Sequence, residues 1–309
     1  MASQQSQDAW SDFWALNSSG PNNGAAGNNS GGGCLPQRWA AIEQAQQAAW
    51  FGFCADLPEG AALLDLATGD GRVLRWMLSK RADLKLLGID LAPKLPMPPK
   101  GTETRGGIAM ESLPFDDGRF NAVTSQFGFE YGDTLRVADE IARVLAPGGK
   151  VGLMVHRGDG PILEHNRQRQ RELLWALKEK GVARKVKAAL KNGQSGIDRA
   201  AKLAEKVAAQ GSAKFGETSP AWEIPEAIRR SCLMGRQAGV GSITETIGII
   251  EGHAKNELGR INSLAGACKT ADARDKVTGA FAAHGLALQD TVAIREPSGR
   301  ELADFITFA

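Results

Sequence analysis

The sequence predicts an α/β fold built on an open, mostly parallel sheet, and two features carry this prediction. The first is a strand, a tight glycine turn and a helix, which follow one another over residues 63–66, 67–71 and 72 onward. The second is another buried-strand pattern that ends on Asp90, about 20 residues after the turn. Strands that alternate with helices in this way form Rossmann-like sheets, which bind ligands at the carboxyl ends of their strands.

The turn over residues 67–71 is where a ligand would meet the sheet. Gly69 and Gly71 let the backbone adopt positive φ and approach a ligand without a Cβ in between. A nicotinamide or flavin dinucleotide site also needs a small residue three positions after the second glycine, so that helix and strand pack closely over the pyrophosphate. Leu74 stands at that position, which argues against a dinucleotide.

The strand that ends at Asp90 places a carboxylate where the ribose hydroxyls of a nucleotide-like ligand need an acceptor. Prolines at 93, 96, 98 and 99 then exclude a regular helix, so an extended loop should lead to a third strand at about 103–109. The pattern next predicts a fourth strand over 120–127, an amphipathic helix over 133–145 and a fifth strand over 150–156.

A long helical segment interrupts the sheet after this fifth strand. Alanine-rich and lysine-rich patterns predict helices over about 163–192, 196–210, 221–238, 242–267 and 270–284. Alternation typical of strands returns over 286–295 and 302–308. The predicted organisation is one α/β domain over 34–157 and 285–309, with a helical insertion over 158–284 between the fifth and sixth strands.

The residues before the first strand divide into two parts. A helix is predicted over 35–57, because its apolar side chains recur at helical spacing. Residues 17–33 are rich in Gly, Asn and Ser, so we expect the N-terminal segment 1–33 to be flexible. Trp10, Phe13 and Trp14 either dock a short tail helix or belong to a lid over the ligand.

Composition narrows the functional classes. The chain has 309 residues, 42% of them hydrophobic, and a formal net charge of +2, so nothing in its overall charge favours nucleic acid as a partner. Its four cysteines and four histidines lack metal-ligand spacing, and we expect no metal. The N-terminus does not resemble a secretory leader and no stretch of eighteen apolar residues occurs, so we expect a cytoplasmic protein without a transmembrane segment.

Four motifs in fixed order resemble class I S-adenosylmethionine (SAM) dependent methyltransferases, of the small-molecule kind found in ubiquinone and menaquinone biosynthesis. They are the Asp-x-x-Thr-Gly-Asp-Gly turn at 65–71, the strand ending in Asp90, the Glu-Ser-Leu-Pro-Phe turn at 111–115 with its following strand, and the helix, Pro-Gly-Gly turn and strand around 143–151. The resemblance implies a seven-stranded Rossmann-like sheet, mostly parallel with an antiparallel C-terminal hairpin. It also implies that the helical insertion between strands 5 and 6 covers the substrate.

The same resemblance implies a SAM site at the carboxyl edge of the sheet. The glycine turn would lie under the methionine end, with Asp65 orienting either the turn or the SAM ammonium, and Asp90 would accept the ribose hydroxyls. Leu91 would cover the adenine. Many relatives hold an acid near the adenine amine where this chain has Ala109, which leaves Glu111 as a substitute or as a turn residue facing water. The predicted cofactor-binding residues are Asp65, Ala67, Thr68, Gly69, Asp70, Gly71, Asp90, Leu91, Met110, Glu111, Gln126 and Phe127.

Residues at the carboxyl ends of the fourth and fifth strands are the catalytic candidates, namely His156, Gln126 and Tyr131. His156 is the first polar side chain after an apolar strand, and its imidazole would take the proton that an acceptor sheds on methylation. The alternative for His156 is a hydrogen-bonded residue at a strand end, and Arg157 beside it could orient an acceptor carboxylate. Packing or capping roles stay open for Phe127, Glu130 and Tyr131.

The interpretation is a SAM-dependent methyltransferase whose acceptor is a small organic molecule, with oxygen, nitrogen or carbon as the methylated atom. A SAM-binding protein without catalysis is the alternative, and the sequence leaves a homodimer open. The fourth strand lacks the Asn/Asp-Pro-Pro-Tyr signature of amine methyltransferases, which argues against nucleic-acid substrates. Basic residues outnumber acidic ones between Arg157 and Lys191, either as a solvated face or as a site for an anionic substrate, headgroup or acidic partner.

Overall fold

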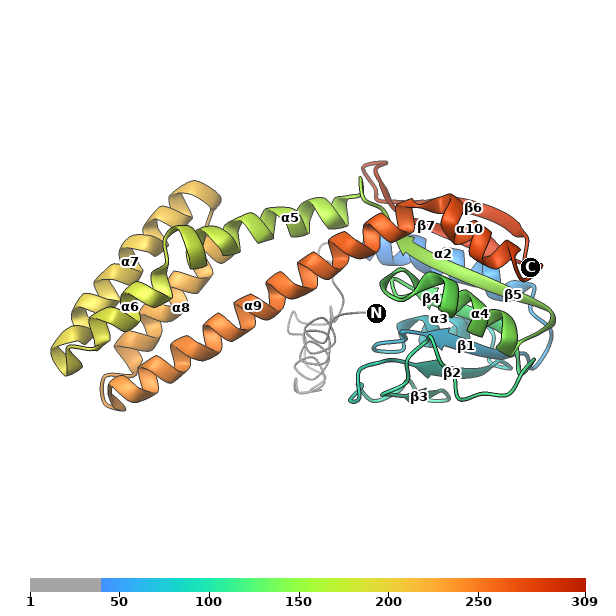
Figure 1. Ribbon diagram of the computed structural model, residues 1–309, viewed down its shortest axis with the longest axis horizontal. Coiled ribbons are helices and arrows are strands. Elements are labelled where there is room, and N and C mark those ends of the chain that lie inside the picture. Colours follow the sequence, from blue (N-terminus) through green and yellow to red (C-terminus); the bar gives the residue numbers. More distant parts are fainter. Residues whose placement is uncertain (1–39) are drawn as a thin grey trace. The chain divides into compact units, whose positions relative to one another are not determined.

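The computed structural model describes residues 40–309, which fall into two compact units (Figure 1). The sheet unit comprises residues 40–163 and Asn262–Ala309, and the helical unit comprises Glu164–Ile261. The N-terminal segment 1–33, with its alternative roles as a docked tail or a lid, lies outside the described residues. The domain boundaries at 157/158 and 284/285 remain a prediction, although the helical unit falls wholly inside the predicted insertion.

The sheet unit contains a seven-stranded sheet in the order β3-β2-β1-β4-β5-β7-β6. Strands β1 to β5 pair in parallel, whereas β7 pairs antiparallel with both β5 and β6. This topology confirms the predicted Rossmann-like sheet with an antiparallel C-terminal hairpin. From β1 the chain adds β2 and β3 on one side and then β4 and β5 on the other, so the order of strands reverses between β1 and β4. Open α/β sheets bind ligands at such a point. The strands are β1 (Ala62–Leu66), β2 (Lys85–Ile89), β3 (Glu103–Arg105), β4 (Phe120–Gln126), β5 (Leu145–His156), β6 (Leu288–Arg295) and β7 (Glu301–Phe308).

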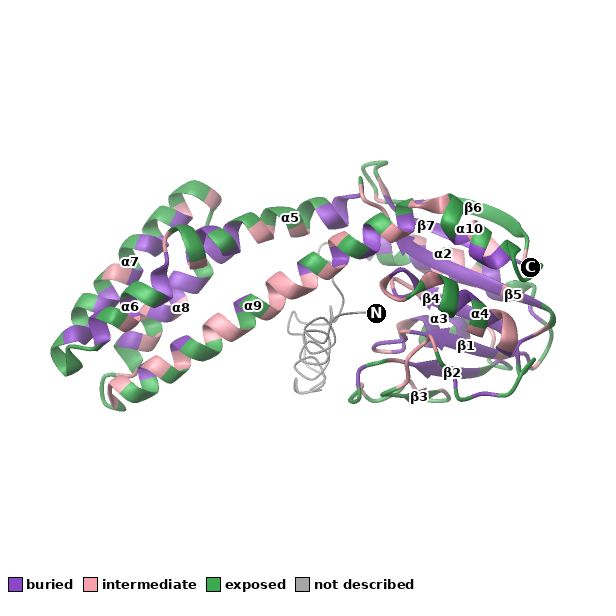
Figure 2. Ribbon diagram, viewed as in Figure 1, coloured by how far each residue is buried: buried purple, intermediate pink, exposed green. Residues whose placement is uncertain are grey.

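Helices cover both faces of this sheet. On one face α2 and α3 pack over a core in which Trp50 meets Phe53 and Phe305 edge to face. On the other face α4 and α10 pack over a core in which Phe281 stacks on Phe308. The central strands are buried along most of their length (Figure 2), and burial on both faces explains why they read as continuous apolar runs. The helices are α2 (Ala40–Ala55), α3 (Arg72–Lys80), α4 (Thr134–Val144) and α10 (Arg274–Ala282).

Two strands differ in length from their predictions. A loop without a helix joins β2 to β3, as the prolines indicate, but β3 ends at Arg105 instead of continuing to about residue 109. Strand β5 begins at Leu145, because Leu145 already pairs with Phe120 before the register shifts at the Pro-Gly-Gly turn. Gly148 in that turn has a φ of 73°, which a residue with a side chain rarely adopts. The short 3-10 helix η1 (Phe129–Tyr131) follows β4 directly.

The helical unit has an apolar core of its own. The single helix predicted over 163–192 is wrong, because a π-helical turn, η2, follows α5 and Gly181 with a φ of 58° separates it from α6. The left-handed conformation costs glycine little, so this position ends one helix and begins the next. Helices α5 and α9 each run from one unit into the other along the chain. The elements are α5 (Pro161–Leu174), η2 (Trp175–Glu179), α6 (Val182–Leu190), η3 (Gly193–Ser195), α7 (Gly196–Phe215), α8 (Pro220–Met234) and α9 (Gly239–Asp272).

Candidate functional site

The turn between β1 and α3 is an unusual backbone structure, because three of its residues have positive φ. Ala67, Gly69 and Gly71 have φ values of 53°, 54° and 68°. The turn is fixed to β2 by two hydrogen bonds, in which Thr68 N donates to Ile89 O at 2.9 Å and Gly69 N donates to an Asp90 carboxylate oxygen at 3.0 Å. Positive φ at a residue with a Cβ is strained, and such strain persists where the surroundings hold the backbone in place.

A second feature of this turn is that it packs closely against β2 and the loop at Pro99, and a glycine lies at each contact. A Cβ on Gly88 of β2 would lie 2.5 Å from Thr68 Oγ1, and one on Gly71 would lie 2.8 Å from Pro99 Cδ. Side chains at these positions would displace the turn. Asp70 points away from this packing and pairs with Arg72, whose Nη2 lies 2.8 Å from Asp70 Oδ2.

Asp65, near the end of β1, is a buried carboxylate. One of its oxygens accepts a hydrogen bond of 2.8 Å from the Thr124 hydroxyl of β4. The other oxygen, Oδ2, has no hydrogen-bond partner, and neither has the nearby buried hydroxyl of Thr68. Burial raises the pKa of Asp65 to about 7, and the nearby hydroxyls of Thr68 and Thr124 only partly oppose this rise. An orphaned buried carboxylate oxygen of this kind is the atom that a bound cationic donor would satisfy.

Asp90 lies directly after β2 and organises the backbone around it. Its Oδ2 accepts from Gly69 N at 3.0 Å, and its Oδ1 accepts from Ala92 N at 2.9 Å. Burial raises the pKa of Asp90, while these two backbone hydrogen bonds act in the opposite direction. Each carboxylate oxygen keeps a second lone pair, so Asp90 can cap the turn and still accept from a ligand hydroxyl. Leu91, next to it, is 41% exposed.

Met110 and Glu111 lie in the turn that follows β3. Glu111 Oε1 accepts from the backbone N of Asp133 at 3.2 Å, and Asp133 is the N-cap of α4. A Cβ on Gly132 would come within 3.0 Å of that carboxylate and within 3.2 Å of the Met110 methyl group. Glu111 therefore contacts the start of α4, and its role beside the adenine stays a prediction.

At the end of β4, Ser125 and Gln126 are held by hydrogen bonds. The Ser125 hydroxyl donates to Leu66 O at 3.1 Å and accepts from Phe129 N at 3.0 Å, so it joins β1 to η1. Gln126 Oε1 accepts from the indole N–H of Trp50 at 2.6 Å, and its amide donates to Gln46 Oε1 at 3.4 Å. An indole N–H can only donate, so the hydrogen bond from Trp50 fixes the orientation of the Gln126 amide and, through it, that of the Gln46 amide. In this orientation the buried Gln46 Nε2 is a donor without a partner.

His156 and Glu130 form a buried pair at the carboxyl end of β5. Glu130 Oε1 lies 2.7 Å from His156 Nδ1 and also accepts from the backbone N of His156 at 3.0 Å. The side chains are 3% and 0% exposed, so water does not compete for this contact. Because Glu130 engages Nδ1, Nε2 is the ring nitrogen that remains for another partner.

Aromatic rings enclose the His156 imidazole. The Phe127 ring lies 4.3 Å from it at an interplanar angle of 33°, and the Tyr131 ring lies 5.9 Å away in an edge-on arrangement. Phe127 has a φ of 57°, which for a bulky residue is a strained conformation. Its backbone N donates to Met154 O at 2.7 Å, which holds this strained residue against β5. The predicted catalytic candidates His156 and Tyr131 thus lie together, with Phe127 as a third wall.

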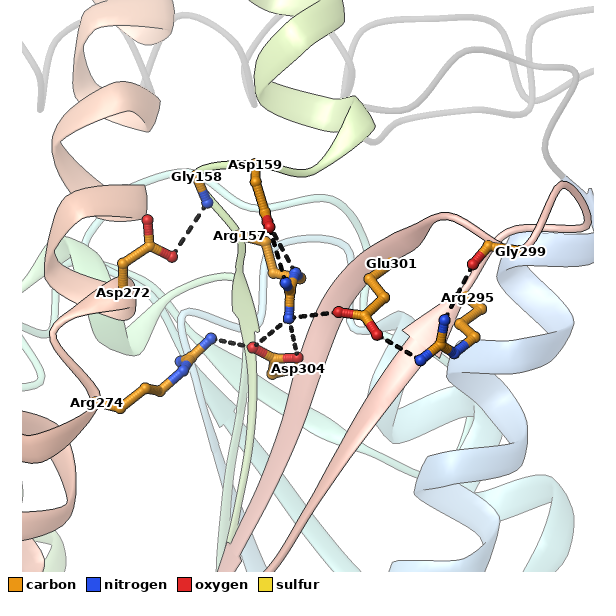
Figure 3. Close-up of polar contacts among 9 residues, drawn as sticks. All are labelled: Arg157, Gly158, Asp159, Asp272, Arg274, Arg295, Gly299, Glu301 and Asp304. Atoms are coloured by element: carbon orange, nitrogen blue, oxygen red, sulfur yellow. Dashed lines mark hydrogen bonds and ion pairs between the residues drawn. The ribbon is translucent and has the colours of Figure 1, made fainter.

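Arg157, by contrast, is already occupied by acidic partners (Figure 3). Its Nη1 lies 2.9 Å from carboxylate oxygens of Glu301 and Asp304, and its Nε lies 3.0 Å from Asp159. Arg274 pairs with the other oxygen of Asp304. These ion pairs link the end of β5 to β7 and to the start of α10. We therefore assign Arg157 to the structure of the sheet edge and no longer to an acceptor carboxylate.

Sequence reasoning missed two side chains of this site. The sequence suggests a role for Glu130 by itself, but the spacing between Glu130 and His156 does not indicate that the two side chains are in contact. Gln46 was not singled out, because a glutamine on an amphipathic helix has no pattern of its own. A charged or amide side chain that is almost fully buried is the signal that a structure supplies for both.

Two further classes of site find no support in the part of the chain that the structure describes. No group of three His, Cys, Asp or Glu side chains between residues 40 and 309 could hold a metal ion. None of the helices in this range is long and apolar enough to span a membrane.

Comparison with known proteins finds a family match within the sheet unit. Residues 64–153 match the family described as methyltransferase domain. Demethylmenaquinone methyltransferase of Thermus thermophilus is 37% identical over 97 residues, which are 29% of this chain and 44% of that protein. A ubiquinone/menaquinone biosynthesis C-methyltransferase of Geobacter sp. is 34% identical over 103 residues, again 44% of its length. The chain therefore spans less than half of these relatives.

Among solved structures, an S-adenosylmethionine dependent methyltransferase from Mesorhizobium loti is 24% identical to this chain, with a TM-score of 0.32. The alignment covers 38% of this chain and 56% of that one. The matched family, its curated relatives and the motifs at 65–71 and Asp90 agree with the sheet order observed here. Residues 64–153 therefore match a methyltransferase domain, and the motifs within them resemble those of class I SAM-dependent methyltransferases.

Proposed function

We propose that this chain is a SAM-dependent methyltransferase that transfers a methyl group to a small organic acceptor. The observation that carries the proposal is that one sheet unit, whose residues 64–153 match a methyltransferase domain, holds an intact glycine turn and, at the same edge of the sheet, a buried Glu130–His156 pair. The turn suits cofactor binding and the pair suits proton removal, which are the two tasks that such a reaction needs.

The residues around the glycine turn fit the cofactor. The unpaired oxygen of Asp65 is suited to the ammonium of the methionine end, and the free lone pairs of Asp90 are suited to the ribose diol. Leu91, the backbone of Met110 and the side chain of Phe127 would border the adenine and the methyl group. When bound, SAM supplies an electrophilic methyl group on a sulfonium.

His156 is the proposed proton acceptor. Glu130 holds Nδ1 as the protonated nitrogen, so the lone pair is on Nε2 and can take the proton that leaves an acceptor hydroxyl or acidic carbon. Holding donor and acceptor in line contributes most of the acceleration in a displacement without a covalent intermediate, up to about 7–11 kcal/mol. A positioned base adds typically about 10²–10⁴-fold. Glu130 acts through His156 and is therefore a positioning residue.

The Gln126–Gln46 pair is proposed to face a bound ligand. Gln46 Nε2 is a buried donor without a partner, and Trp50 fixes the direction in which both amides point. Such a donor calls for an oxygen acceptor, such as a carbonyl or a carboxylate. We further propose a cytoplasmic location and no nucleic-acid substrate, because the net charge is near zero and the three described cysteines are free thiols. The homodimer stays open.

The test is to incubate the protein with methyl-labelled SAM and a metabolite extract, and then to identify the compound that gains the label. Transfer to a small organic molecule by the wild type, and about a hundredfold less by His156→Ala, supports the proposal. SAM binding without transfer to any acceptor would assign the protein to the non-catalytic class.

A further inference from the structure

The helical unit contains a basic cavity that plays no part in the site described above. It has a volume of about 260 Å³ and lies among η2, α6 and α7. Three of its lining residues are lysines, one from each of three segments, and none is acidic. The lining residues are Lys180, Val182, Lys185, Leu203, Lys206, Val207 and Gln210.

Some other basic residues of the same unit have acidic partners, unlike these lysines. Lys187 Nζ lies 2.6 Å from Glu251, and Arg169 Nε lies 2.7 Å from Glu257. Within residues 40–309, by contrast, Lys185 and Lys206 have no ion pair, and the ammonium of Lys180 contacts only the Trp175 ring, at 5.1 Å from its centroid. Two of the basic residues between Arg157 and Lys191, Lys180 and Lys185, thus line this cavity together with Lys206.

The cavity has features that would hold an anion in place. Val182 is the first residue of α6, and this helix has neither an acidic residue in its first turn nor a side-chain cap. Trp175, which supports Lys180, packs edge to face against Phe215 at 5.5 Å. Positive charge therefore accumulates here without an internal counter-ion.

We propose that this cavity binds a phosphate group that carries a short apolar substituent. Lysine ammonium groups are point charges that suit the several oxygens of a phosphate, whereas planar carboxylates are matched better by arginine. Val182, Leu203 and Val207 provide an apolar wall beside the charges. The volume lies below the roughly 300–1,000 Å³ of pockets for drug-sized ligands, so it suits a small phosphate ester. The cavity lies wholly within the helical unit, so the proposal does not depend on methyl transfer.

The phosphate could belong to a soluble ester or to a lipid headgroup, and the experiment separates these sources. Butyl phosphate and inorganic phosphate are titrated into the full chain by calorimetry, and vesicles that contain phosphatidic acid are tested by sedimentation. The cavity variant is Lys180→Gln/Lys185→Gln/Lys206→Gln. Its matched control is Lys178→Gln/Lys191→Gln/Lys202→Gln, which removes the same charge from exposed lysines of the same part of the chain.

Butyl phosphate should bind the wild type and the control alike, more tightly than inorganic phosphate does, and should bind the cavity variant about tenfold to hundredfold more weakly. Vesicle binding that is also lost only in the cavity variant would identify a lipid headgroup as the source. Vesicle binding that is unchanged in the cavity variant, together with loss of butyl phosphate, would identify a soluble ester. Absence of butyl phosphate binding, or equal losses in both triple variants, would overturn the proposal. Circular dichroism and melting temperatures confirm that both variants remain folded.

Discussion

Two neighbouring corners of the sheet are built by different means. At the β1–β2 corner, which comprises Asp65, the turn 67–71 and Asp90, backbone amides and positive φ angles set the geometry. At the β4–β5 corner, which comprises Gln126, Phe127, Glu130 and His156, side chains contact side chains. A site made of backbone needs particular residues at fixed spacing, and a site made of side-chain pairs needs only that the fold bring them together.

Removal of the His156 imidazole should have the largest effect and tests the difference between the two corners most strongly. His156→Ala should lower turnover by roughly a hundredfold or more, because the base is lost, and should leave SAM affinity nearly unchanged. Steady-state kinetics and calorimetry on the same preparation measure both quantities. A variant that keeps more than about a tenth of the wild-type turnover would show that the proton leaves by another route.

Glu130→Gln tests how the imidazole is positioned. The amide keeps the size of the side chain but removes the charge that holds Nδ1 protonated, so kcat should fall while the KM of the acceptor stays within about twofold. Glu140→Gln is the matched control, since Glu140 is a carboxylate of the same unit whose partner is Arg143. The pH profile of kcat should change only in Glu130→Gln, and an identical profile in both variants would make Glu130 a purely structural residue.

The second largest effect should be on the pH dependence of stability, through Asp65. Its pKa is about 7 in the folded protein and 3.8 as its ordinary value, so it contributes stability below about pH 4 that is lost as the pH rises to about 7. The free energy of unfolding should fall over this range by on the order of a few kcal/mol.

Urea denaturation of the wild type and of Asp65→Asn at pH 5 and pH 8, without cofactor, checks this expectation. The wild type should lose more stability between the two values than the variant does. Asp90, whose pKa burial also raises, is present in both proteins, so the difference isolates Asp65. Parallel pH profiles would mean that Asp65 is ionised in the folded protein at neutral pH.

A smaller effect is expected where the two corners touch. A Cβ on Gly128 would lie 2.4 Å from the Cβ of Ala67 and 2.9 Å from Ser125 Oγ. Gly128→Ala should therefore cost about 1–3 kcal/mol of stability, as overpacking typically does. Gly52→Ala in α2, where nothing lies within 4 Å, is the control and should be neutral or stabilising. Thermal denaturation of both variants gives the comparison, and equal melting temperatures would show that the turn can move.

The same contrast explains what the sequence could predict. The sheet, the glycine turn, the helix-free loop after Asp90 and the C-terminal hairpin follow from local patterns, and all are present. The sequence does not indicate the helix end at Gly181, because the lysines and alanines on both sides favour helix and a single glycine between them is a weak signal. Glu130 and His156 lie 26 positions apart, and only the parallel pairing of β4 with β5 makes them partners. Arg157 was misjudged for the same reason, since its acidic partners Glu301 and Asp304 come from the far end of the chain.

The central claim is that Asp90 of the β1–β2 corner contributes to the affinity for the cofactor and that His156 of the β4–β5 corner does not. Calorimetric titration of SAM into the wild type, Asp90→Ala and His156→Ala tests this claim most directly. Hydrogen bonds to a charged group contribute about 1.5–3 kcal/mol, so Asp90→Ala should bind SAM roughly tenfold to hundredfold more weakly, while His156→Ala should match the wild type within about twofold. A wild type that does not bind SAM, or a His156→Ala variant that loses as much affinity as Asp90→Ala, would contradict the account.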